Sequence, residues 1–130
     1  MASSPKSKYK WPGKKILIVE DDPISSQLFN ILLEKSGSEL ISANNGLEAV
    51  RICQRDSGIS LVLMDVQLPV MDGYTATMKI KQMRSDLPVI VQTAYVYEQE
   101  EEKCLNAGFD GYLTKPIESA DLYKLINQLI

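Results

Sequence analysis

The sequence predicts an α/β protein with a single doubly wound, five-stranded parallel sheet flanked by five helices. Short apolar runs alternate with helical patterns, and the runs are nearly continuously apolar, as in strands that helices cover on both faces. With right-handed crossovers, the common order for five such strands is 2-1-3-4-5. The five runs are KILIVE (15–20), ELISA (39–43), LVLMD (61–65), PVIVQT (88–93) and GYLT (111–114).

Helices fit the gaps between these runs. The first opens at Asp22-Pro23, an N-cap followed by proline at the first helical position. The second opens at Asn45, three residues before Glu48, which is the spacing of a capping box. The expected ranges of the first four helices are 23–36, 46–57, 73–84 and 97–107. The last helix has one apolar stripe with i, i+3, i+4, i+7 spacing, formed by Leu122, Leu125, Ile126 and Leu129.

The domain organisation follows from composition. The chain has 130 residues, enough for one domain with a sizeable core. Its first thirteen residues, MASSPKSKYKWPG, are rich in Ser, Pro, Lys and Gly and have no apolar period. We therefore expect a disordered linker or tail over 1–13 and one folded domain over 14–130.

Charge and cysteine content narrow the partners and the compartment. Residues 1–15 hold five lysines and no acid, so the remainder of a chain with net charge −3 is distinctly acidic and a poor nucleic-acid binder. No apolar run approaches the roughly 20 residues that span a bilayer, so we expect no direct membrane contact. Cys53 and Cys104 lie far apart in helical patterns and are interpreted as reduced packing residues, which favours a cytoplasmic location.

The sequence contains no histidine. This absence excludes histidine general-base catalysis, histidine metal ligands and phosphohistidine chemistry within this chain. Any phosphohistidine donor must therefore lie on another domain or chain.

Polar residues stand where four of the strands end. Strand 1 runs into Glu20-Asp21-Asp22, strand 3 ends in Asp65, strand 4 ends in Thr93 and strand 5 is followed by Lys115. The order 2-1-3-4-5 makes these four strands consecutive neighbours, and ligands bind beyond the carboxyl ends of such sheets. We expect these side chains to share one cleft with Asp65 at its middle.

The residue types in this cleft indicate phosphoryl transfer. Three carboxylates so close together would repel unless a cation joined them, and an all-oxygen ligand set selects a hard ion, Mg²⁺ or Mn²⁺. Asp65 would act as the nucleophile and form an aspartyl phosphate. The metal and Lys115 would offset charge on the phosphoryl oxygens while Thr93 donates a hydrogen bond.

Each element also has a purely structural interpretation. Asp22 is interpreted as a helix N-cap, and Glu20-Asp21 could be first-turn charges that the helix dipole favours. Asp72-Gly73 is interpreted as a turn and helix start, and Lys115-Pro116 alone would be a charged turn. Only the conjunction of all four strand ends is specific.

That conjunction resembles the receiver domain of two-component response regulators over about residues 14–130. The matching segments are VED (19–21), MDVQLPVMDG (64–73), TA (93–94) and KP (115–116). The resemblance implies a flavodoxin-like fold of the receiver type.

The resemblance also implies roles for single residues. Asp65 would be the phosphoryl acceptor, and Glu20, Asp21 and the backbone carbonyl of Gln67 would join Asp65 in binding Mg²⁺. Thr93 and Lys115 would contact the phosphoryl group. Two further roles carry over: Tyr112 matches the switch aromatic that moves with Thr93, and Gln67 and Tyr95 hold the positions that tune phosphate lifetime.

The partners follow from the same resemblance. We expect the phosphoryl donor to be a histidine kinase or histidine phosphotransfer domain, and a phosphorylation-dependent dimer is a further expectation. YKWPGKKILIVED (9–21) is similar to the joint that precedes the C-terminal receiver of hybrid histidine kinases, and a stand-alone regulator is the alternative. The domain would catalyse its own phosphorylation and dephosphorylation only, whereas a hybrid parent would be a protein kinase on the cytoplasmic side of the membrane.

Three other functions compete with this hypothesis. A haloacid-dehalogenase-type, Mg-dependent phosphatase also uses an aspartyl phosphate, but it needs Asp-x-Asp after strand 1, where this chain has Glu20-Asp21-Asp22. A flavin mononucleotide carrier needs a Ser/Thr/Gly-rich loop there. A receiver-shaped interaction module without phosphorylation would lack one of the four groups, and none is missing.

Gln92 is unusually polar for a buried fourth strand, and the pattern gives no account of it.

Overall fold

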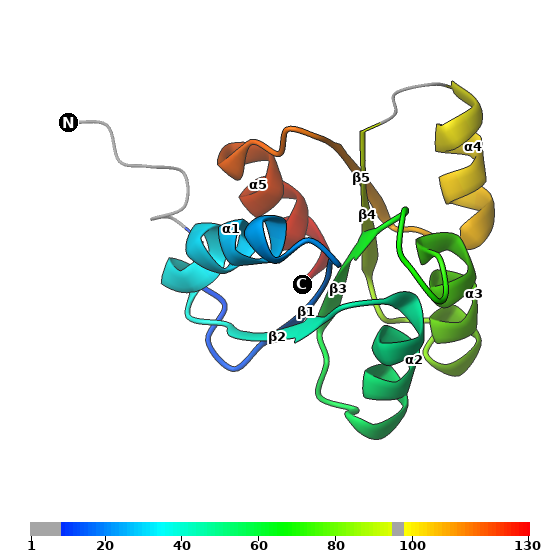
Figure 1. The fold of residues 1–130 in the computed structure, drawn as a ribbon. Helices are drawn as coiled ribbons and strands as arrows, with labels where there is room; N and C mark the ends of the chain where they lie inside the picture. The colour runs from blue at the N-terminus through cyan, green and yellow to red at the C-terminus, as the bar shows by residue number, and fades with distance from the viewer. Residues whose placement is uncertain (1–8, 95–97) are drawn as a thin grey trace.

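The computed structural model describes residues 9–94 and 98–130 and confirms the predicted fold class. Five parallel strands form one sheet in the order β2-β1-β3-β4-β5 (Figure 1). The strands are β1 (Lys15–Val19), β2 (Glu39–Ala43), β3 (Leu61–Asp65), β4 (Val89–Thr93) and β5 (Gly111–Thr114). The helices are α1 (Pro23–Leu33), α2 (Gly46–Arg55), α3 (Gly73–Met83), α4 (Glu98–Ala107) and α5 (Ser119–Leu129).

Helices cover both faces of the sheet, as the apolar strands require. Helices α1 and α5 lie on one face, and α2, α3 and α4 lie on the other (Figure 1). Alternate residues of each central strand enter the two cores, so Ile90 packs toward α1 and α5 while Val89 and Val91 pack toward α2 and α3. Burying both faces fixes the register of every strand in the centre of the sheet.

The helix starts follow the predicted caps. The side chains of Asp22, Asn45 and Asp72 accept hydrogen bonds from backbone N–H groups in the first turns of α1, α2 and α3. Helix α1 ends earlier than expected, at Leu33, and a 3₁₀ turn continues it to Gly37, whose φ of 78° is the left-handed conformation that glycine favours. The other described ends lie within two residues of the expected ones. Residue 97, the expected start of the fourth helix, lies outside the described residues.

Part of the expected disordered tail is instead packed on the domain. Trp11 is only 5% exposed, stacks on Tyr123 of α5 at 5.2 Å between ring centroids and donates from Nε1 to Asn127 Oδ1 at 3.0 Å. Its backbone N–H donates to the carbonyl of Ser36, and Tyr9 stacks on both rings. Residues 9–13 therefore differ from the expectation because two aromatic rings bury enough surface to order the segment. Residues 1–8 lie outside the described part.

The two remaining expectations about composition concern cysteines and membranes. Cys53 is a free, buried thiol in the α2 core, and burial raises its pKa to about 11, as expected for a packing residue. The side chain of Cys104 lies outside the described part. Within residues 9–94 and 98–130, no helix has both the length and the apolar character needed to cross a membrane.

Candidate functional site

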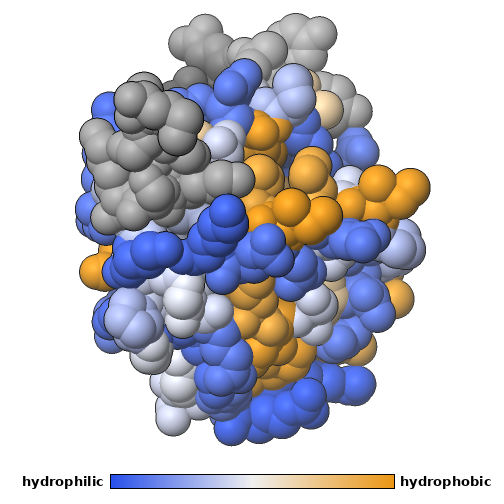
Figure 2. All heavy atoms as spheres, turned by 90° about the vertical axis from the view of Figure 1, so that its left-hand side faces the viewer, coloured by the Kyte–Doolittle hydropathy of each residue, from blue (hydrophilic) through white to orange (hydrophobic). Residues whose placement is uncertain are grey.

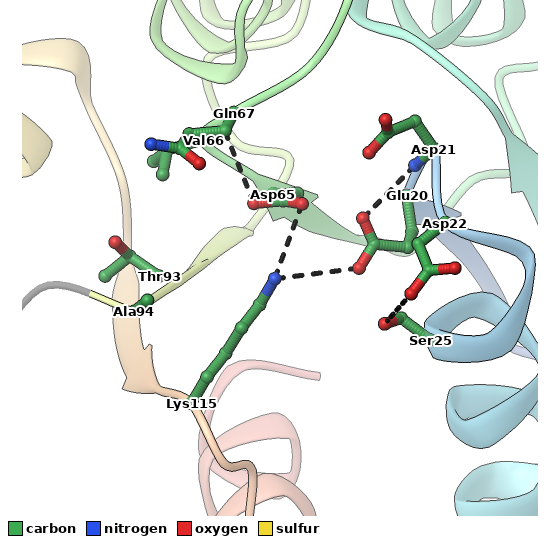
Figure 3. A pocket seen from close by; sticks show the side chains of 10 residues that line it. All are labelled: Glu20, Asp21, Asp22, Ser25, Asp65, Val66, Gln67, Thr93, Ala94 and Lys115. Carbon is green, nitrogen blue, oxygen red and sulfur yellow. Dashed lines mark hydrogen bonds and ion pairs between the residues drawn. The ribbon is translucent and has the colours of Figure 1, made fainter.

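The carboxyl edge of the sheet forms an open pocket of about 280 Å³. It lies where β1, β3, β4 and β5 end, as the strand order requires, and Figure 3 shows its side chains converging from these four strands. The lining residues are Glu20, Asp21, Asp22, Ser25, Asp65, Val66, Gln67, Thr93, Ala94 and Lys115. The predicted acids, the hydroxyl and the ammonium are therefore brought together.

Asp65 occupies the middle of this pocket. It is the last residue of β3, is 6% exposed, and has one carboxylate oxygen available to each of two partners (Figure 3). Its Oδ1 accepts the backbone N–H of Gln67 at 3.3 Å, and its Oδ2 lies 3.5 Å from Lys115 Nζ. A backbone donor and an ammonium thus hold the carboxylate at the end of a buried strand, which offsets part of its desolvation.

Glu20 and Asp21 approach Asp65 from the end of β1. Glu20 is 2% exposed and its Oε1 lies 3.7 Å from Lys115 Nζ, so one lysine serves two acids. The backbone N–H of Asp21 donates to Glu20 Oε2 at 3.1 Å, while the side chain of Asp21 is exposed. Burial, together with the neighbouring Asp65 carboxylate, raises the pKa of Glu20 to about 8, and Lys115 opposes that rise.

These carboxylates have the geometry of a divalent cation site. Glu20, Asp21 and Asp65 each offer an oxygen, and the three oxygens lie within 4.8 Å of one another. An all-oxygen set of this kind suits Mg²⁺ or Mn²⁺. A cation would also remove the like-charge repulsion that favours a protonated Glu20, so the residues present fit the expected metal.

Sequence reasoning gave no role to Ser25, Val66 or Ala94, and of these three lining residues Ser25 has a polar side chain. It lies one turn into α1, and its Oγ donates to Asp22 Oδ2 at 2.9 Å (Figure 3). Asp22 is the N-cap that was expected, accepting also from the N–H of Ile24, but it lines the pocket as well. The signal for Ser25 was its spacing of three residues from the N-cap, which places it on the same side of the helix start.

Position 73, just after Asp72, requires a glycine because the chain there packs closely against the backbone of Asp65 and Val66. A Cβ on Gly73 would lie 2.1 Å from the carbonyl oxygen of Asp65 and 2.9 Å from Cα of Val66. Its N–H donates to the carbonyl of Val66 at 3.1 Å. The start of α3 is thus packed directly against the backbone that carries Asp65, and only glycine permits that approach.

The structure also describes three of the four remaining predicted residues, Thr93, Tyr112 and Gln67. Thr93 is buried and lines the pocket, and Tyr112 of β5 pairs in register with Val91. Alternation along the strands puts Thr93 and Tyr112 on the same face of the sheet, and Tyr112 is partly buried in the core beside α2 and α3. Gln67 is exposed at the rim, and Tyr95 lies outside the described residues.

The chain belongs to the response regulator receiver domain family, whose sequence profile matches residues 16–127. It is 38% identical to a segment of the sensor protein GacS of Pseudomonas syringae, over 86% of this chain and 13% of that protein. It is 30% identical to histidine kinase 3 of Arabidopsis thaliana, over 89% of this chain and 13% of that protein. The chain therefore spans about one eighth of the length of these two proteins.

Solved structures agree with this assignment. The receiver domain of a Pseudomonas aeruginosa sensor histidine kinase, crystallised with magnesium in its active site cleft, matches with a TM-score of 0.83 at 34% identity, over 90% of this chain and 97% of that one. A yeast receiver domain from Saccharomyces cerevisiae, crystallised with a histidine phosphotransfer signalling protein, matches with a TM-score of 0.84 at 30% identity, over 92% of this chain and 90% of that one. The hybrid-kinase resemblance and the receiver fold are thereby confirmed.

Proposed function

We propose that this receiver domain accepts a phosphoryl group from a phosphohistidine onto Asp65 and changes conformation in response. One observation carries the proposal: the pocket holds a buried carboxylate at a strand end, between a backbone donor and an ammonium, beside two further acids. This arrangement supports in-line transfer, because it positions the nucleophile and supplies charge where the transition state develops it.

In the proposed reaction an Asp65 carboxylate oxygen attacks phosphorus, forming a P–O bond as the P–N bond to the donor imidazole breaks. The imidazole nitrogen takes up a proton as it leaves. Lys115 Nζ lies 3.5 Å from Asp65 Oδ2 and is positioned to move onto a phosphoryl oxygen once Asp65 carries the phosphoryl group as an acyl phosphate. Thr93, which is buried at the end of β4, would donate its hydroxyl to another phosphoryl oxygen.

Glu20, Asp21 and Asp65, with the backbone carbonyl of Gln67, would hold the divalent cation. Mg²⁺ or Mn²⁺ bound there supplies positive charge that neutralises the acids and the phosphoryl oxygens. The magnesium in the Pseudomonas aeruginosa receiver supports this assignment. Gln67 at the pocket rim, together with Tyr95, would set the phosphate lifetime.

The conformational response would run through Thr93 and Tyr112. The two residues lie on one face of the sheet in adjacent strands, so movement of Thr93 toward the phosphoryl group changes the space open to the Tyr112 ring. The surface formed by α4, β5 and α5 would change with it, and a phosphorylation-dependent dimer could use that surface.

The donor would be a histidine kinase or a histidine phosphotransfer domain. It must bring an imidazole to Asp65, and apolar side chains of α1 are exposed beside the pocket: Ile24 is 78% exposed, Leu28 51% and Ile31 52%. Figure 2 shows hydrophobic surface gathered on the face to which α1 contributes. Such a patch beside an acidic pocket supports docking of a partner domain.

The resemblance to sensor kinases supports an origin as the receiver of a hybrid histidine kinase on the cytoplasmic side of a membrane. A stand-alone regulator is the alternative, and one relative favours it. A 14.6 kDa protein of Leptolyngbya boryana is 35% identical over 87% of this chain and 87% of its own length. Receivers of both kinds would use the same acceptor chemistry.

The experiment that tests the proposal is intact mass measurement after incubation with acetyl phosphate, with Mg²⁺ or with EDTA. We expect one phosphoryl adduct on the wild type with Mg²⁺ and none on Asp65→Asn. Asp72→Asn is the matched control, because it makes the same change at an N-cap where asparagine caps equally well.

An adduct on Asp65→Asn, or one that forms equally in EDTA, would contradict the proposed site. No adduct on the wild type, with Mg²⁺ binding measured separately, would leave either a receiver-shaped interaction module or a site that accepts a phosphoryl group only from its own donor. Many turnovers of a small phosphoester would instead indicate the phosphatase.

A further inference from the structure

Asp22 places a fourth acid at the rim of the acidic pocket. Its side chain lines that pocket together with Glu20, Asp21 and Asp65, and the described residues of the lining include one cation, Lys115 (Figure 3). Among the residues that the structure describes, the acids whose oxygens lie within 4.8 Å of one another are the other three, without Asp22. The Asp22 carboxylate therefore adds negative charge to the pocket without belonging to the candidate metal site.

Two hydrogen bonds hold the Asp22 carboxylate ionised and in place. Its Oδ2 accepts from Ser25 Oγ at 2.9 Å, and its Oδ1 accepts from the backbone N–H of Ile24 at 3.2 Å. The bond from Ser25, with the bond from Ile24 second, holds the pKa of Asp22 below its ordinary value, and the charge of Lys115 acts in the same direction. Asp22 is thus a fixed negative charge within electrostatic reach of the lysine in the pocket.

The cap at the start of α1 does not by itself require a charged side chain, because asparagine and serine cap a helix about as well as aspartate. Asp72 shows the same cap at the start of α3, where its two oxygens accept from the backbone N–H and the hydroxyl of Thr75. Asp72 lines a groove between α3 and α4 and is not part of the acidic pocket. The two aspartates therefore share their helix role, and they differ in where the charge lies.

We propose that Asp22 is a specificity-determining residue that disfavours phosphoryl donors in proportion to their negative charge. At neutral pH acetyl phosphate is a dianion, whereas phosphoramidate and a phosphohistidine with a protonated ring each have one net negative charge. A fixed carboxylate at the rim repels the dianion more strongly, so the pocket favours phosphoryl groups bound to nitrogen over small acyl phosphates. This inference rests on the proposed phosphoryl transfer to Asp65.

The test compares initial rates of adduct formation on the wild type and on Asp22→Asn, by intact mass at saturating Mg²⁺ and low ionic strength. With either donor a P–O bond forms to Asp65, while the donor's P–O bond breaks to release acetate or its P–N bond breaks to release ammonia. Removing the charge should raise the rate about twofold with phosphoramidate and about fourfold with acetyl phosphate, because the repulsion doubles with the donor's charge. Both increases should largely disappear at about 0.5 M KCl.

A binding measurement detects the same charge without phosphoryl transfer. Mg²⁺ carries two positive charges, so Asp22→Asn should weaken its binding about fourfold in titration calorimetry. Asp72→Asn is the matched control, because it makes the same change at the same kind of cap, and it should alter neither Mg²⁺ affinity nor the ratio of the two donor rates. A role of Asp22 in capping alone would change stability and leave that ratio unchanged.

Three results would overturn the inference: an equal change of rate with both donors, an increase that persists at high salt, or an unchanged Mg²⁺ affinity of Asp22→Asn. No adduct on either protein would also overturn it, because a charge at the rim would then not decide between donors. Asp65→Asn is measured beside them and separates this inference from the proposed function. An adduct on Asp65→Asn contradicts the proposed function, whereas adducts confined to Asp65 with an unchanged donor ratio overturn this inference alone.

Discussion

Asp65 and Gln92 are partners in the sheet, yet their surroundings differ completely. They are paired in register between β3 and β4, and alternation sends both side chains toward the same face. Asp65 has a backbone donor and an ammonium within 3.5 Å, whereas neither amide atom of Gln92 has a partner among the described residues. The two residues are both buried, but only Asp65 is paired by other groups of the chain.

The function of a buried polar residue at the edge of a parallel sheet is better judged from its partners than from its burial. Asp65 is held by groups that the proposed phosphoryl transfer would use, so its burial and its partners point to the same chemistry. Gln92 is buried without a hydrogen-bond partner among the described residues, so its burial by itself indicates no chemistry. A count of buried polar groups would treat the two alike.

The largest effect is expected from Gly73→Ala, which places a new methyl group against the backbone of Asp65. The added Cβ would meet the Asp65 carbonyl oxygen at 2.1 Å, so either α3 or the end of β3 must shift. We expect the free energy of unfolding, measured with urea, to fall by about 3 kcal/mol. Phosphorylation by acetyl phosphate should fall with it, because Asp65, the proposed nucleophile, is displaced.

Gly111→Ala is the matched control for Gly73→Ala. The atoms nearest its Cβ would belong to the Leu125 side chain, at 2.9–3.2 Å, and a side chain can move more easily than backbone. Equal stabilities of the two variants would show that the start of α3 does not constrain Asp65.

An intermediate effect on the free energy of unfolding is expected when a change of pH removes the proton from Glu20, beside Asp65. Because the pKa of Glu20 is raised to about 8 from 4.5, the folded protein keeps a proton that the unfolded chain releases. The stabilising contribution of protonated Glu20 is thus complete below about pH 4.5 and is lost as the pH rises toward 8. In EDTA, unfolding free energy should fall by about 2 kcal/mol from pH 6 to 7.5, at about 1.4 kcal/mol per pH unit.

Glu20→Gln should abolish that slope, and urea titrations at both pH values measure it. Glu39→Gln, at an exposed position of the edge strand β2, should leave the slope in place. A slope that survives in Glu20→Gln would assign the linked proton to another group.

The smallest effect is expected from Gln92→Leu, which tests the other half of the comparison. Replacing an unpaired buried amide by an apolar side chain of similar size should raise the unfolding free energy by about 1 kcal/mol. Gln54→Leu, on the exposed side of α2, serves as the control and should change stability little. A loss of stability in Gln92→Leu would mean that bound water already pairs the amide.

The acidic pocket could be predicted because its residues lie at strand ends. Once strand order is known, Glu20, Asp65, Thr93 and Lys115 must meet at one edge, however far apart they are in sequence. Helix starts such as Asn45 were predictable for a similar reason, since a cap acts on backbone groups two or three residues away.

Contacts between helices and termini could not be predicted in this way. Trp11 lies in a segment whose composition indicates a tail, and it is ordered by Tyr123 and Asn127, more than a hundred residues later. The composition of a segment shows how much apolar surface that segment can bury against itself. Whether Trp11 is buried depends instead on the surface that α5 presents to it in the folded domain.

By itself, the sequence determined the sheet order, the elements and the residues that meet around Asp65, because period, caps and crossover handedness are local properties with few global solutions. Three features became evident only from the folded chain: Lys115 lies between two acids, Gly73 packs against the backbone of Asp65, and Gln92 is buried without a partner among the described residues. These depend on distances between elements, and packing sets such distances only when the whole chain has folded.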